Sequence, residues 1–175
     1  MKRKMIAVTL ISLAGLLASG FGYCFTKNRA LFSAAVTCGT IFYHLAVRLA
    51  AGLLIDAKYH NQMDYTKKWF CERSFERNLY QKLRVKEWKN RLPTFTPENF
   101  SFKKHSIAEI VQVTCQSEVV HEVNMVLSFV PVLFSVWFGS LGVFLITSCL
   151  AFLYDSVFVI IQRYNRPRLM RLIRK

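Results

Sequence analysis

The chain has 175 residues, of which 53% are hydrophobic and 19% charged, with 24 Lys and Arg against 10 Asp and Glu. Soluble domains are about 45–50% apolar and about 25% charged, so this composition is shifted towards lipid. The apolar content excludes intrinsic disorder, and five scattered cysteines exclude a disulfide-stapled secreted mini-protein. A plain nucleic-acid binder is disfavoured, because the basic and the apolar residues lie in separate blocks. We therefore expect a small integral membrane protein with one basic aqueous segment.

Three long apolar tracts predict the membrane-spanning helices. The first covers residues 5–25 and the second residues 30–55. The third, residues 123–161, is too long for one span of about 20 residues, and residues 139–142 (Gly-Ser-Leu-Gly) are its natural bend. The sequence therefore predicts an all-α integral membrane protein with about four transmembrane helices and a basic amphipathic interfacial segment between the second and the third.

The first tract has an alternative interpretation. Lys2, Arg3 and Lys4 before an apolar run are also typical of a secretory signal peptide. Against this, the run is longer than a usual signal core, and no small-x-small cleavage site ends it. We expect an uncleaved span.

The distribution of positive charge predicts the orientation. Twelve Lys and Arg lie between residues 56 and 105, and six more lie in residues 163–175. Positive residues are retained on the cytoplasmic side, and four spans place both segments on the same side as the basic N-terminus. We expect a multi-pass protein of the cell membrane with both termini cytoplasmic. Its parts would be two transmembrane helices (1–55), a cytoplasmic basic amphipathic segment (56–106), a polar helix leading into a transmembrane hairpin (107–162) and a basic cytoplasmic tail (163–175).

The basic segment between the helix pairs is too short to be an independent enzyme domain. Residues 65–90 have helical character, and Phe75, Leu79 and Leu83 form one apolar face. Such a basic helix with aromatic residues is typical of the headgroup region of a membrane. We therefore expect lipid, and no nucleic acid, as its partner.

Two prolines and a capping signal mark the end of this segment. Pro93 and Pro97 are expected to break the helix. Ser106, with Glu109 three residues later, predicts a capping box at the start of the next helix.

Three ionisable residues before the third span form the strongest candidate for a catalytic group in the chain. Glu118, His121 and Glu122 lie at positions i, i+3 and i+4 and share one helix face. A carboxylate beside a histidine fixes its tautomer and stabilises the imidazolium, which suits a general base. We take the three as candidate catalytic residues, with Glu118 orienting His121. The alternative is a structural cluster, solvated or paired with Arg48 and the basic segment.

Other polar residues in the spans suggest further roles. His44 and Arg48 share a face of the second span and are candidates for stabilising an oxyanion. Asp155 lies near the cytoplasmic end of the fourth span. We expect no metal site, because the cysteines and histidines lack zinc spacing and a di-iron site needs the ExxH motif twice.

Three motifs resemble the glycosyl-4,4'-diaponeurosporenoate acyltransferase family of the staphyloxanthin carotenoid pathway. They are the C-terminal string Gln162-Arg163-Tyr164-Asn165-Arg166-Pro167-Arg168-Leu169, the box over residues 85–93 (VKEWKNRLP), and the pair Glu118 and His121 before the third span. The similarity covers roughly residues 69–172. An alternative alignment places Glu122 and Met125 on the glutamate and histidine of the family.

The resemblance implies a membrane acyltransferase that esterifies a hydroxyl of a glycolipid or glycosylated carotenoid-like acceptor with a fatty acyl chain. The implied partners are that lipid acceptor and a fatty acyl donor such as acyl-CoA, a substrate rather than a cofactor. The competing function is a non-enzymatic small membrane scaffold or lipid-binding protein.

The arginines after the last span suggest where the donor binds. The forks of Arg163, Arg166 and Arg168 suit phosphate, so we expect them to bind the donor. The alternative is that they are only a positive-inside stop signal. Pro167 is expected to stop or kink the helix.

Overall fold

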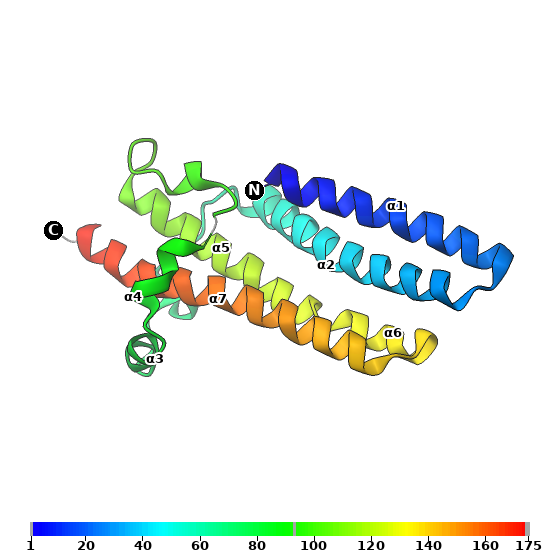
Figure 1. Cartoon of the computed structure of the whole chain (residues 1–175). Coiled ribbons are helices and arrows are strands. Elements are labelled where there is room, and N and C mark those ends of the chain that lie inside the picture. Colours follow the sequence, from blue (N-terminus) through cyan, green and yellow to red (C-terminus); the bar gives the residue numbers. More distant parts are fainter. Residues whose placement is uncertain (1, 93, 174–175) are drawn as a thin grey trace. The chain divides into compact units, whose positions relative to one another are not determined.

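The computed structural model describes residues 2–92 and 94–173, and its secondary structure in these ranges is entirely helical (Figure 1). Within the described ranges, four helical stretches are long and apolar enough to cross a membrane. They are α1 (Lys2–Thr26), α2 (Arg29–Tyr59), the stretch Ile107–Phe138 and α7 (Leu141–Ile173). The predicted all-α fold with four transmembrane helices is confirmed. Pro93, which we expected to break a helix, lies outside the described residues.

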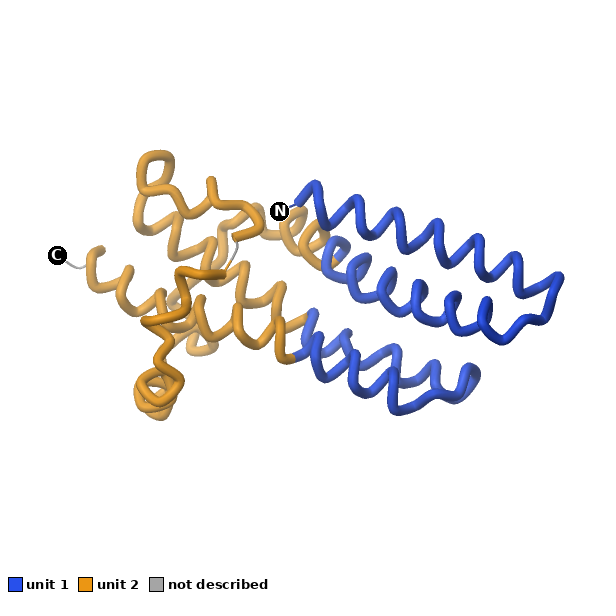
Figure 2. The backbone as a smooth tube through the Cα atoms, viewed as in Figure 1, with its two compact units in different colours: residues 1–50, 124–152 blue, residues 51–123, 153–175 orange. Residues whose placement is uncertain are grey.

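The chain divides into two compact units (Figure 2). Unit 1 comprises residues 1–50 and 124–152, and unit 2 comprises residues 51–123 and 153–175.

Small residues bring α1 and the first part of α2 close together within unit 1. A Cβ added at Gly15 would lie 2.8 Å from the Sγ atom of Cys38, and one at Gly22 would lie 3.0 Å from the side chain of Leu31. Residue numbers rise along α1 as they fall along α2, so the two helices are antiparallel (Figure 1). Between helices in lipid, such close approach supplies the van der Waals contact that holds them together.

A proline interrupts the third apolar stretch. The helix α5 (Ile107–Leu127) ends and α6 (Val130–Phe138) begins beside Pro131, which has no N–H to donate to the carbonyl of Leu127 four residues earlier. The hydroxyl of Tyr43 donates to that carbonyl at 2.9 Å. In lipid an unsatisfied carbonyl is costly, so this bond stabilises the break.

The predicted bend of the hairpin lies between α6 and α7. Gly139 and Ser140 adopt φ values of 70° and 55°, a left-handed region that favours glycine at the end of a helix. This bend agrees with the predicted division of the third apolar tract into two helices.

The segment over residues 65–90 has the predicted helical character, but as several short helices rather than one continuous helix. Arg84 has a left-handed φ of 49° and separates two of the pieces. The cause is tertiary packing, because Phe70 packs against Cys115 while Tyr80 and Val85 pack against Tyr164. The pieces are η1 (Lys68–Phe70), α3 (Glu76–Lys82), α4 (Val85–Trp88) and η2 (Lys89–Arg91).

The predicted apolar face nevertheless exists on and beside α3. Phe75, Leu79 and Leu83 are 55%, 37% and 41% exposed. The adjacent side of the helix carries the buried residues Glu76 and Tyr80. The short helix therefore exposes one apolar side and buries the side next to it.

The start of α5 has the predicted capping box. After η3 (Pro97–Phe100), the backbone N–H of Ser106 donates to Glu109 Oε2 at 2.6 Å, and the N–H of Glu109 donates to Ser106 Oγ at 3.3 Å. This reciprocal pair satisfies N–H groups that the first turn of a helix leaves without partners.

The last helix does not stop at Pro167. α7 continues through this proline to Ile173. Arg163, Arg166 and Arg168 therefore lie on the same helix as Asp155, and the helix fixes the spacing between them.

Candidate functional site

Within unit 2, a row of contacts between polar side chains joins α5 to α7. Thr114 contacts Arg166, Glu118 contacts Arg163, and His121 contacts Asp155. Residue numbers rise on α5 as they fall on α7, so the two helices run antiparallel there. We call this row of contacts the polar ladder.

The contact between His121 and Asp155 is the last contact of the polar ladder, at the end of α5 that leads into α6. The Nδ1 atom of His121 lies 2.9 Å from Asp155 Oδ1, and the side chain of Asp155 is fully buried while that of His121 is 20% exposed. The ring of Phe158 stacks on the imidazole with centroids 4.8 Å apart and planes 10° apart. The carboxylate favours the tautomer with the proton on Nδ1, which leaves the Nε2 lone pair able to accept a proton.

The carboxylate of Glu118, which we expected to orient His121, contacts two arginines instead. Its Oε1 accepts a hydrogen bond from Arg163 Nη1 at 2.6 Å, and its Oε2 accepts one from Arg166 Nη2. Glu118 is fully buried, and a buried carboxylate needs paired cations to offset the loss of water. The carboxylate in contact with His121 is instead that of Asp155, which lies in another helix.

Arg163 and Arg166 hold the segment after α2 against the polar ladder. Arg163 donates to Glu76 Oε1 at 2.7 Å and to the carbonyls of Trp69 and Cys71 at 2.9 and 3.0 Å. Arg166 donates to the carbonyl of Phe70 at 3.2 Å. Irregular backbone beside a membrane needs such donors for its carbonyls, and the rigid forks of arginine supply several at once.

The remaining candidate carboxylate, Glu122, lies at the border of this network. Its Oε2 accepts a hydrogen bond from the indole Nε1 of Trp69 at 3.0 Å. Trp69 itself is 53% exposed. Glu122 thus contacts the connecting segment, whereas its helix neighbour His121 contacts α7.

Arg168 differs from the other two arginines after the last apolar run. Its guanidinium lies over the ring of Tyr164, with Cζ 3.5 Å from the centroid, and it donates to the carbonyl of Tyr164. It lines a groove on the surface of unit 2, whereas Arg163 and Arg166 use their donors on protein acceptors.

His44 and Arg48 lie together in unit 1, as their spacing predicts. Arg48 Nη1 donates to the carbonyl of His44 at 2.6 Å, and Nη2 donates to the carbonyl of Ala151 at 3.2 Å. Among the residues that the structure describes, no group of three His, Cys, Asp or Glu side chains is placed to hold a metal ion.

The fold and the polar ladder define a small α-helical protein with four helices capable of spanning a membrane and a buried ionic core beside a histidine–carboxylate pair. Within this class, the chain belongs to the CrtO family, the glycosyl-4,4'-diaponeurosporenoate acyltransferases, whose model matches residues 66–175. The predicted resemblance is confirmed, and membership supports an acyltransferase role. The matched range includes every residue of the polar ladder. No curated protein and no solved structure matches the chain.

Proposed function

We propose that the protein transfers a fatty acyl group to a hydroxyl of a lipid or glycolipid acceptor at the cell membrane, with His121 as the general base. The observation that carries this proposal is the pairing of His121 with Asp155 at 2.9 Å, within a chain of an acyltransferase family. The four apolar helices support a membrane setting. The basic segments at both ends and between the helix pairs support an orientation with both termini in the cytoplasm.

The proposed reaction needs one proton acceptor that later becomes a proton donor. Nε2 of His121 takes the proton of the acceptor hydroxyl as its oxygen forms a bond to the acyl carbonyl carbon. The tetrahedral intermediate then collapses, the bond from the acyl carbon to the leaving group breaks, and the imidazolium returns the proton to the leaving group. With a thioester donor, the products are the ester and a thiol. The buried Asp155 stabilises the imidazolium that forms between the two steps.

The roles of the two glutamates follow from their contacts. Glu118 holds Arg163 and Arg166 and acts as a structural residue of the polar ladder. Glu122, the second candidate carboxylate, is hydrogen-bonded to an exposed tryptophan, one position after His121. We propose that it positions the connecting segment next to the base.

The test compares lipid extracts of host cells that lack the gene with extracts of cells complemented by wild type, His121→Ala or His105→Ala. His105 is a matched control, because it lies outside the polar ladder and its side chain is 37% exposed. The proposal expects one acylated lipid to return with wild type and with His105→Ala, and to remain absent with His121→Ala at equal membrane abundance. If His121→Ala restores the lipid, the proposed base is wrong. If wild type changes no acylated lipid, the scaffold or lipid-binding function is favoured.

A further inference from the structure

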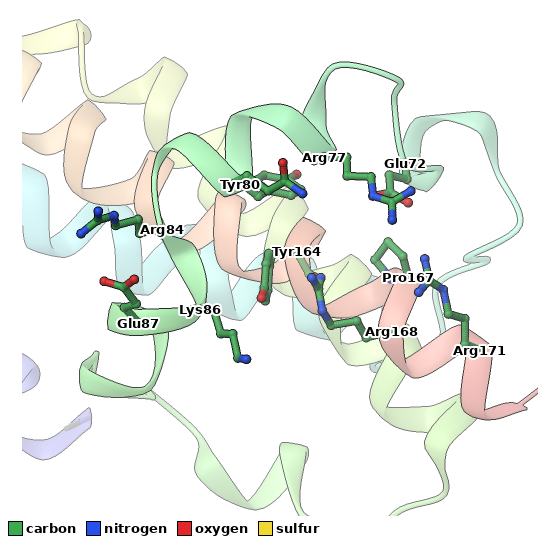
Figure 3. A pocket seen from close by; sticks show the side chains of 11 residues that line it. Glu72, Arg77, Tyr80, Arg84, Lys86, Glu87, Tyr164, Pro167, Arg168 and Arg171 are labelled. Carbon is green, nitrogen blue, oxygen red and sulfur yellow. The ribbon is translucent and has the colours of Figure 1, made fainter.

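A groove of about 410 Å³ opens on the surface of unit 2 between the end of α7 and the short helices α3 and α4 (Figure 3). Its lining is strongly basic, with five cations against two carboxylates, Glu72 and Glu87. The cations are Arg77, Arg84, Lys86, Arg168 and Arg171.

Most of these cations have no charged partner in the protein. Among the described residues, no ion pair within 4.0 Å involves Arg77, Arg84, Lys86 or Arg171. By contrast, Arg163 and Arg166 both form ion pairs with buried glutamates. The positive charge of the groove is therefore available to a ligand. Like charges gathered in a concave site attract an anion more strongly than the same charges spread over a surface.

The floor of the groove fixes the orientation of its donors. Arg168 is stacked on Tyr164, which lies edge-on against Tyr80 with ring centroids 5.7 Å apart. Burial and the neighbouring carboxylate of Glu76 raise the pKa of Tyr80, so its hydroxyl stays protonated and uncharged. Two aromatic rings and a planar guanidinium thus form a rigid base for the groove.

Lys89, at the border of the groove, shows the effect of crowded positive charge. Its Nζ atom donates to Asn165 Oδ1 at 2.7 Å and lies 5.1 Å from the centroid of Tyr164. Burial, and after it the charge of Arg168, lowers the pKa of Lys89. An anion bound beside Arg168 would relieve this repulsion.

We infer that this groove binds the phosphate-bearing end of the acyl donor. The inference rests on the proposed acyl transfer. It places the donor site at Arg168 and the cations opposite it, because Arg163 and Arg166 are occupied by contacts within the protein. Phosphate oxygens accept charge-assisted hydrogen bonds from arginine forks and lysine ammonium groups. Two exposed apolar side chains, Phe75 at the N-cap of α3 and Leu79 within it, belong to the short helix that also supplies lining residues of the groove. They give an attached acyl chain a route along α3 into lipid.

Two sources could present this phosphate chemistry, a soluble nucleotide thioester or the headgroup of an anionic phospholipid. The experiment uses the full chain in nanodiscs and two probes. The first probe is coenzyme A, which carries the phosphates of the thioester but no acyl group. The second is the preference of the protein for phosphatidylglycerol over phosphatidylcholine among the lipids of mixed nanodiscs.

The variants are Lys86→Gln and Arg171→Gln in the groove, with Lys82→Gln as the matched control. Lys82 is also an exposed lysine of these short helices, but it does not line the groove. Each groove variant is expected to weaken binding of the phosphate probe about tenfold, and Lys82→Gln by less than about twofold. Added salt should weaken binding to wild type and remove most of the difference between the variants.

The outcomes separate the source of the phosphate from the existence of the site. Loss of coenzyme A binding in the groove variants identifies a nucleotide donor, and loss of the phosphatidylglycerol preference alone identifies a lipid headgroup. If neither probe distinguishes the groove variants from Lys82→Gln, the inference is overturned. Because coenzyme A binding needs no chemistry, the groove and the role of His121 can fail independently of each other.

Discussion

Glu118 and Arg166 form an ion pair that is shut off from solvent inside unit 2, with side chains that are 0% and 1% exposed. Arg163 shares the same carboxylate through its other oxygen. The three residues connect α5, α7 and the segment after α2, which Arg163 and Arg166 hold through backbone carbonyls. This cluster explains why charges that the sequence places beside a membrane span are tolerated there, because each is neutralised by a partner.

Glu118→Gln should destabilise the protein strongly. The change leaves Arg166 buried without its counter-charge, and breaking one partner of a buried pair costs about 3–5 kcal/mol. Glu98→Gln is the control, because Glu98 pairs with Lys104 in an exposed bridge with side chains that are 74% and 60% exposed, which is worth less than about 1 kcal/mol. Denaturant unfolding of the purified protein in detergent measures both. Equal stability of the two variants would contradict the structural role of Glu118.

Asp155→Asn should lower the rate of acyl transfer about 10²- to 10⁴-fold, the typical contribution of a positioned general base, because the carboxylate sets the tautomer of that base. An asparagine amide can donate to Nδ1 and then places the imidazole proton on Nε2, where it blocks the proposed base. The control is Asp64→Asn, since Asp64 is exposed and accepts its hydrogen bonds locally, from Thr66.

The measurement for Asp155→Asn is the initial rate of product formation per folded protein. A rate for Asp155→Asn equal to that of Asp64→Asn would show that Asp155 does not act on the base.

The spans and local caps could be predicted from the sequence because their signals are local. Span length and hydropathy follow from the thickness of a bilayer, and the Ser106 and Glu109 box needs only four consecutive residues. The bend at Gly139 and Ser140 is likewise a property of adjacent residues.

The partner of His121 could not be predicted in the same way. Glu118 is its neighbour on one helix face, but Asp155 is 34 residues away, and pairing across helices depends on the register between α5 and α7. One signal was present. Asp155, Gln162 and Arg166 are spaced seven and four residues apart and share a face of α7, which is the face that meets α5. The groove could not be predicted from the sequence for a similar reason, because the breaks between its short helices arise from tertiary packing.

Gly15→Ala and Gly20→Ala should have different effects on the pairing of α1 and α2. Alanine favours a helix over glycine at both positions by about 1 kcal/mol. A Cβ at Gly20 meets no atom within 4 Å, whereas one at Gly15 meets Cys38 Sγ at 2.8 Å. Gly15→Ala should therefore be less stable than Gly20→Ala, and Cys38→Ala should remove the difference. Thermal unfolding of the single and double variants measures this, and equal melting temperatures of the two single variants would rule out the close approach.

Tyr43→Phe should destabilise unit 1 by about 1 kcal/mol, the usual net value of one hydrogen bond. The lost hydroxyl leaves the carbonyl of Leu127 without the donor that compensates for Pro131. Tyr59→Phe, on the same helix but exposed, is the control and should change stability by less than about 0.5 kcal/mol.

A double-variant cycle identifies the proline as the cause of this dependence. Pro131→Ala restores an N–H that can donate to Leu127, so Tyr43→Phe should cost less in that background than in wild type. Denaturant unfolding of the four proteins gives the coupling energy between Tyr43 and Pro131. A coupling energy of zero would mean that the Tyr43 hydroxyl stabilises the break for a reason other than the missing proline donor.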